Sequence, residues 1–166
     1  RLKTIRRHLG RDVTKCLVCC FILTRLDYCN ALLAGLPASA LAPLQRVQNS
    51  AARLILDLKS SDHISPALME LHWLPIRQRI AYKLSTLVFK SLHHQAPDYL
   101  TELFTTIAEI PTLSSLRSST DGKLHVSRTR LQFGERAFAV AGARQWNSLP
   151  AQLRSVEDYI SFKSKL

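Results

Sequence analysis

The feature that most constrains the fold is the stretch 44–58, where apolar residues recur at alternating steps of three and four. These positions are Leu44, Val47, Ala51, Leu54 and Leu58. Such spacing aligns side chains in one stripe of an α-helix, which has to be buried. The other side carries long polar groups, with no acid before Asp57, and Pro43 suits the first turn. We therefore expect a helix with an apolar back and a basic, amide-rich front, which bears Gln45, Arg46, Asn49 and Arg53.

A second helical pattern runs from Ile76 to His93. Its apolar stripe comprises Ile76, Ile80, Leu84, Leu87 and Ser91. A separate face carries Arg79, Lys83, Thr86 and Lys90, without an acid from Arg77 to Lys90. Solvated helix faces usually mix both signs of charge, so this face indicates an anionic partner, with simple solvation as the alternative. We expect the stripes of the two helices to share one core, so that their cations flank a groove.

The remaining segments predict a mainly α-helical, bundle-like fold with a short extended or hairpin segment in the C-terminal third. Composition shifts to Pro, Ser, Thr and Leu after residue 107, which is typical of a linker. Residues 123–133 lose the helical period between two glycines. The expected organisation is therefore a helical region over 1–107, a linker over 108–122 and a smaller C-terminal region over 123–166.

Charge and composition narrow the possible functions. The 166 residues carry a formal net charge of +11 and are 46% hydrophobic. This hydrophobic content argues against intrinsic disorder, and the charge favours a polyanionic partner, either nucleic acid or an anionic membrane surface, over a merely basic protein. The longest apolar run, 16–23, is too short to span a bilayer, and no signal peptide is indicated. We expect no membrane association.

The cysteines do not form a recognisable metal site. Cys16, Cys19, Cys20 and Cys29 lie in or near one apolar helical pattern. A structural zinc site needs a second pair of ligands across a loop, and none is present. We expect buried free thiols in a reducing compartment, hence an intracellular protein of the cytoplasm or the nucleus, with no metal.

The sequence lacks the motifs of an enzyme. A polymerase needs paired aspartates to hold two metal ions, commonly beside a tyrosine. The pairs Asp27-Tyr28 and Asp158-Tyr159 have the wrong order and no second acid. Histidines that could serve a cysteine or serine nucleophile have no motif around them, and no glycine-rich phosphate loop occurs. We expect no catalytic activity from this chain alone and no cofactor.

Both tryptophans have two possible roles. Trp73 and Trp146 lie close in sequence to cations and could stack on bases. Trp73 also lies between Leu71 and Leu74, Trp146 precedes Leu149-Pro150, and a buried tryptophan is a common core anchor. We favour the core for both.

Several motifs in register resemble the region downstream of the polymerase core in reverse transcriptases of LINE-type (non-LTR) retrotransposons. The resemblance extends from about Ile5 to the end of the chain. The motifs that carry it are residues 25–37 (RLDYCNALLAGLP), 44–54, 71–75 (LHWLP), 116–119 (LRSS), 136–138 (RAF) and 146–150 (WNSLP). In that family this region forms a helical thumb and a C-terminal extension, which grip the template–primer duplex.

The resemblance implies a non-catalytic thumb and post-thumb fragment of an RNA-directed DNA polymerase, without the palm that bears the metal-binding carboxylates. The chain looks truncated, and the palm of the parent protein is an implied partner. Retroelement copies are commonly truncated, so a non-functional relic is an alternative. A second alternative is an α-helical protein-interaction or scaffold module with an acidic partner.

The expected ligands are RNA and RNA/DNA or DNA duplex, bound without sequence preference because helix cations meet phosphates rather than bases. The candidate nucleic-acid-binding residues are Arg46, Arg53, Arg77, Arg79, Lys83, Lys90, Arg128 and Arg130.

Overall fold

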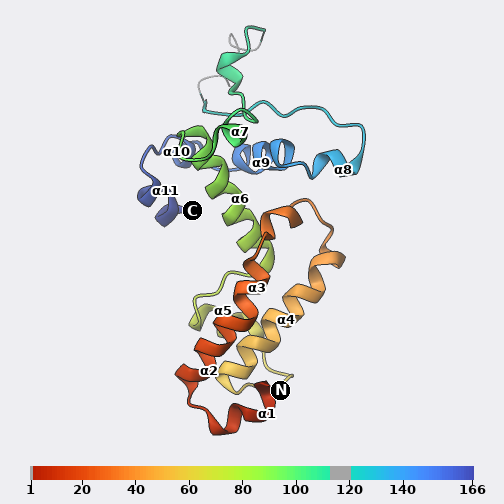
Figure 1. Ribbon diagram of the computed structural model, residues 1–166, viewed down its shortest axis with the longest axis vertical. Coiled ribbons are helices and arrows are strands. Elements are labelled where there is room, and N and C mark those ends of the chain that lie inside the picture. Colours follow the sequence, from red (N-terminus) through yellow and green to blue (C-terminus); the bar gives the residue numbers. More distant parts are fainter. Residues whose placement is uncertain (1, 113–120) are drawn as a thin grey trace. The chain divides into compact units, whose positions relative to one another are not determined.

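The computed structural model describes residues 2–112 and 121–166 and is mainly helical, which confirms the predicted fold class (Figure 1). Within these ranges the only β-pairing is one antiparallel bridge between Thr106 and Leu124. None of the described helices combines the length and apolarity that a membrane crossing requires.

The chain divides into two compact units. The N-terminal unit comprises Arg1–Asn30 and Leu36–Arg79, and the C-terminal unit comprises Ala31–Gly35 and Ile80–Leu166. This division differs from the three regions expected from the sequence, because residues 80–107 belong with 123–166. Part of the expected linker, residues 113–120, lies outside the described residues.

The N-terminal unit is built from helices that follow one another closely along the chain. A continuous helical stretch joins α2 to α3 through a π-helical turn, and α2 and α5 both contact α4 (Figure 1). The bounds are α1 Leu2–Ile5, η1 Arg6–His8, α2 Arg11–Val18, η2 Cys19–Leu23, α3 Thr24–Asp27, α4 Ala38–Leu56 and α5 Ile64–Glu70. The next helix, α6 (Ile76–Leu92), begins in this unit and confirms the pattern read from Ile76.

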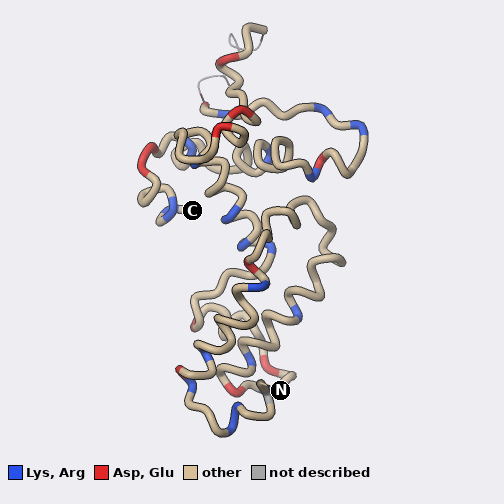
Figure 2. The backbone as a smooth tube through the Cα atoms, in the orientation of Figure 1, with Lys and Arg blue, Asp and Glu red and all other residues tan. Residues whose placement is uncertain are grey.

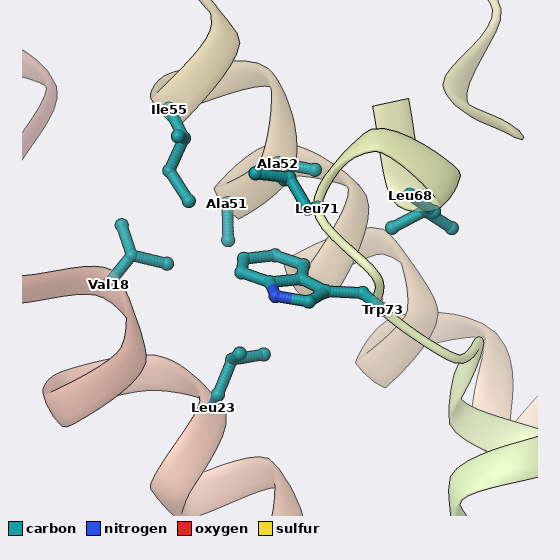
Figure 3. Packing of buried hydrophobic residues seen from close by; sticks show 8 residues of the cluster. All are labelled: Val18, Leu23, Ala51, Ala52, Ile55, Leu68, Leu71 and Trp73. Carbon is teal, nitrogen blue, oxygen red and sulfur yellow. The ribbon is translucent and has the colours of Figure 1, made fainter. Parts of the chain in front are cut away.

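Trp73 is the centre of the N-terminal core. Its indole lies between Val18 and Leu23 on one side and Ala51 and Ala52 of α4 on the other (Figure 3). Ile55, Leu68 and Leu71 complete the buried cluster. The core role favoured for this tryptophan is confirmed, because its side chain is buried.

Helix α4 is rotated relative to the expected orientation. Its buried residues are Gln48, Ala51, Ala52 and Ile55. Of the predicted stripe, only Ala51 is buried, whereas Val47 is 46% exposed. Leu44, Leu54 and Leu58 are half-buried. The helix also begins at Ala38, after Pro37, so Pro43 lies inside it rather than in its first turn.

Hydrogen bonds explain this rotation. The Gln48 Nε2 atom donates to the Leu74 carbonyl at 2.9 Å, and the Gln45 Oε1 atom accepts from the Ile76 N–H at 2.9 Å. Gln45 also donates to Asn49 at 2.8 Å. Amides with satisfied hydrogen bonds can be buried, and the Ile76 N–H is one of the donors left without a partner at the start of α6. The amide-rich front of α4 therefore faces its own chain.

The C-terminal unit contains the end of α6 and the remaining short helices. Their bounds are η3 Asn30–Leu33, α7 Asp98–Thr101, η4 Ile107–Glu109, α8 Gln132–Glu135, α9 Phe138–Asn147, α10 Ala151–Arg154 and α11 Tyr159–Lys165. The buried cluster of this unit comprises Val88, Phe89, Leu124, Ala143, Trp146, Leu153 and Phe162. The expected single core is therefore wrong: the described buried residues form two clusters, one in each unit.

Aromatic stacking joins three helices in the C-terminal core. The rings of Phe89 and Phe162 stack with centroids 4.4 Å apart, and Trp146 lies 5.7 Å from Phe162. The Trp146 Nε1 atom donates to the Gly122 carbonyl at 2.9 Å, so this tryptophan is also a core anchor. At Gly142 a Cβ would meet Val88 Cγ2 at 2.9 Å, which explains the glycine where α9 packs against α6.

The segment between Lys123 and α8 contains no helix and no hairpin, and of the two expected forms it takes the extended one (Figure 1). Both backbone groups of Leu124 bond to the side-chain amide of Asn147, each at 2.8 Å. The segment is therefore held by a side chain of α9 as well as by the single bridge between Leu124 and Thr106.

Candidate nucleic-acid interface

The cationic face expected on α6 begins in the N-terminal unit with Arg77 and Arg79. Arg77 is exposed. The Arg79 side chain is only 19% exposed and forms a two-pronged ion pair with Asp27 of α3. In this pair the Arg79 Nε atom donates to Asp27 Oδ1 at 2.7 Å, and the NH2 group donates to Oδ2. Arg79 therefore has its charge compensated within the unit.

The rest of this face lies in the C-terminal unit and is not a row of solvated cations. Lys83 is exposed, but Thr86 is buried. The Lys90 ammonium lies over the ring of Tyr159 at 4.8 Å from its centroid, a cation–π contact. The expected ladder is therefore interrupted, because Thr86 is buried and Lys90 contacts α11.

The two arginines of α4 differ in exposure. Arg46 is exposed beside a shallow apolar pocket of about 370 Å³. Arg53 is half-buried and donates one N–H to the Asp62 carbonyl at 3.1 Å. The Nε atom of Arg53 is buried and has no hydrogen-bond partner. Arg53 therefore keeps an unused donor.

Arg128 and Arg130 lie on the segment that precedes α8 in the C-terminal unit. Both are exposed. Neither forms an ion pair within the described residues. Their guanidinium groups are thus available to an anionic ligand.

Few of the described cations are neutralised by acids. The ion pairs in the described ranges join Arg11 to Glu70, Arg79 to Asp27, Lys123 to Asp121 and Arg144 to Glu135. Among the candidate residues only Arg79 belongs to this set. Lysines and arginines are spread along both units rather than gathered on one element (Figure 2). We expected the cations of α4 and α6 to flank one groove. These residues are divided between the two units, so each unit by itself contains only part of the expected site.

Sequence reasoning missed one grouping of cations in the N-terminal unit. Arg6 and Arg7 of η1 line a pocket of about 540 Å³ together with Arg53 of α4. The sequence signal for this grouping is that the first eleven residues contain no acid. The grouping depends on a contact across 48 positions, which no local pattern predicts.

The cysteines are free, but the expectation that they are buried is wrong. Cys16 and Cys20 are exposed and Cys19 is half-buried, because the outer side of the α2–η2 stretch faces solvent, and Cys29, which follows α3, is exposed as well. A side-chain hydrogen bond with Cys16, which favours the neutral Cys20 thiol, raises the pKa of Cys20 and so disfavours a reactive thiolate. In the described part of the chain no three histidine, cysteine or acidic side chains are grouped to hold a metal ion.

Comparisons with protein-family models, with curated proteins and with solved structures find no match for this chain.

Proposed function

We propose that this chain binds nucleic acid through its phosphate backbone, without sequence preference, as the thumb-like region of a LINE-type reverse transcriptase. The ligand class is RNA, RNA/DNA hybrid or DNA duplex. The most exposed candidate contacts are Arg46, Arg77, Lys83, Arg128 and Arg130. In this proposal Arg79 and Lys90 mainly stabilise their own units.

The observation that carries the proposal is uncompensated positive charge. The chain has a net charge of +11, and the five exposed contacts form no ion pair among the described residues. Cations without acidic neighbours release condensed counterions when they meet phosphates, and this release drives non-specific binding. The sequence motifs 25–37, 44–54 and 146–150 supply the separate support for the retroelement origin.

A direct test measures binding of the purified chain to two unrelated 20-base-pair RNA/DNA hybrids. We expect equal affinities within about threefold, because phosphate contacts carry no base information. Poly-glutamate of matched charge serves as a competitor. Equal competition by poly-glutamate and by nucleic acid would favour the scaffold alternative, in which the basic surfaces meet an acidic protein.

The proposal also excludes polymerase activity by this chain alone. Incorporation of nucleotides requires paired carboxylates that hold two metal ions. Asp27, the acid of the Asp27-Tyr28 pair, is engaged by Arg79. Metal-dependent primer extension by the purified chain would contradict the proposal, and an open reading frame for a palm directly upstream in the genome would support the origin.

A further inference from the structure

The pocket between η1 and the end of α4 has the composition of an anion site. Its volume, about 540 Å³, falls in the usual range for small-molecule sites. Three arginines line it, Arg6, Arg7 and Arg53, against one acid, Asp57. Asp57 is exposed and forms no ion pair within the described residues. The lining therefore carries an excess of positive charge.

Arg6 is held in place by the end of α4. Its Nε atom donates to the Leu54 carbonyl at 2.9 Å and its NH2 group to the Ile55 carbonyl at 3.2 Å. A third bond joins NH1 to the Leu9 carbonyl at 3.0 Å. The last carbonyls of a helix lack intrahelical partners and attract a cation. Because a guanidinium has five N–H groups, two of those of Arg6 keep no acceptor.

Unused donors on the other two arginines complete the site. The Arg53 Nε atom is buried without a partner, although its NH2 group bonds to the Asp62 carbonyl. Arg7 is exposed, and among the described residues its guanidinium donates only to the neighbouring His8 imidazole, at 3.2 Å. Because the Arg53 Nε atom has almost no exposed surface, Arg53 adds positive charge to the pocket, while the exposed Arg7 guanidinium offers N–H groups that a ligand can reach. The arginines that line the pocket therefore have more N–H donors than the described residues around them have acceptors.

We propose that this pocket binds a phosphomonoester, namely the 5′-terminal phosphate of a nucleic-acid strand. A doubly charged terminal phosphate matches three guanidinium groups better than a singly charged internal phosphate. The rest of the lining includes Ser50, Ser60 and Leu58. Their hydroxyl and apolar side chains suit the attached nucleoside. The nucleic-acid source rests on the proposed function, whereas the preference for a phosphomonoester rests on the pocket alone.

The test uses the full chain and three probes: a 3′-labelled single-stranded 10-mer with a 5′-phosphate, the same strand with a 5′-hydroxyl, and adenosine 5′-monophosphate. We expect the 5′-phosphate to strengthen binding about tenfold, the effect of one charge-assisted contact. Arg7→Gln should abolish this preference, since the exposed Arg7 makes no long-range bond. The matched control is Arg25→Gln, an exposed arginine of α3 that is not among the lining residues.

A second variant should strengthen binding and so does not depend on loss of structure. Asp57 has a left-handed backbone with φ of 55°, which asparagine also tolerates. Asp57→Asn removes the one acid of the lining and should increase the 5′-phosphate preference about threefold.

The outcomes separate this inference from the proposed function. Equal binding of both oligonucleotides by the wild-type chain would overturn the pocket inference and leave general nucleic-acid binding intact. A preference that survives in folded Arg7→Gln would overturn it as well. Binding of adenosine 5′-monophosphate that is lost in Arg7→Gln, without binding of either oligonucleotide, would support the pocket and contradict the nucleic-acid source. Absence of binding to all three probes would overturn both.

Discussion

Gln48 has no solvent-exposed surface, although the apolar stripe expected for α4 does not include it. Its amide bonds to the Leu74 carbonyl and accepts from Gln45, which in turn holds the first N–H of α6. Leu74 precedes Pro75, so this carbonyl lies in the turn that connects the Trp73 core to α6. One polar side chain therefore positions a loop.

Replacing Gln48 should destabilise the protein. Gln48→Ala removes the partner of the Leu74 carbonyl and of the Gln45 amide, and each group left unsatisfied costs about 1–3 kcal/mol. The denaturant midpoint should fall without loss of cooperativity. Arg46→Ala on the exposed side of the same helix is the control, expected within about 0.5 kcal/mol of the wild type. A midpoint unchanged by Gln48→Ala would place this residue on the surface.

Asp158 links the stability of α11 to pH. It caps the helix by accepting from the Ser161 N–H at 2.7 Å, and this hydrogen bond lowers the pKa of its carboxyl below 3.8. A group whose pKa is lower in the folded state stabilises the protein at pH values above its unfolded-state pKa. This stabilisation is lost as the pH falls through the folded-state pKa. Asp158→Asn keeps a capping side chain that does not titrate.

We therefore expect the wild-type melting temperature to fall more steeply than that of Asp158→Asn as the pH decreases from 5 to below 3.8. Thermal unfolding followed by circular dichroism at several pH values measures the difference. Parallel curves for the two proteins would mean that this cap does not form.

At the scale of elements, α4 and α6 show what a sequence pattern can and cannot specify. The start of α6 and most of its buried stripe were predictable: Ile76, Ile80, Leu84 and Ser91 are buried, whereas Leu87 is half-buried. The orientation of α4 was not predictable. A periodicity analysis counts glutamine as polar and places it in solvent, whereas backbone groups of another segment satisfy these amides by hydrogen bonding.

The candidate site likewise has features that the sequence could predict and others that it could not. The exposure of Arg46 and Lys83 follows from their positions on helices. The pairing of Arg79 with Asp27 spans 52 positions and depends on how α3 and α6 meet, so local spacing cannot reveal it. The contact of Lys90 with Tyr159 likewise depends on packing of α11 against α6.

The orientation of α4 is testable by paired truncations. Ile55→Ala should cost about 2–5 kcal/mol, because it leaves a cavity beside Trp73 in the N-terminal core. Val47→Ala should change stability by about 0.5 kcal/mol or less, because Val47 is 46% exposed. Urea denaturation of both variants gives the comparison. A larger cost at Val47 than at Ile55 would restore the orientation expected from the apolar spacing.

At the scale of the whole molecule, the proposed binding of nucleic acid depends on lysines and arginines that have no acidic partner among the described residues. A net charge of +11 on 166 residues creates a long-range attraction for any polyanion. Contacts with phosphates add a separate, local term, the release of counterions at each neutralised phosphate. Binding to the phosphates of a nucleic acid requires this release of counterions. A protein that is merely basic would show only the long-range attraction.

The slope of log affinity against log salt for an RNA/DNA hybrid tests this claim most directly. Neutralising about five phosphates predicts a wild-type slope near −4 to −5, and Arg128→Gln with Arg130→Gln should flatten it by about two units. Arg11→Gln with Arg144→Gln removes the same charge from ion-paired positions and should leave the slope nearly unchanged. Circular dichroism confirms that each variant is folded. A wild-type slope near zero, or equal flattening by both pairs, would contradict the account.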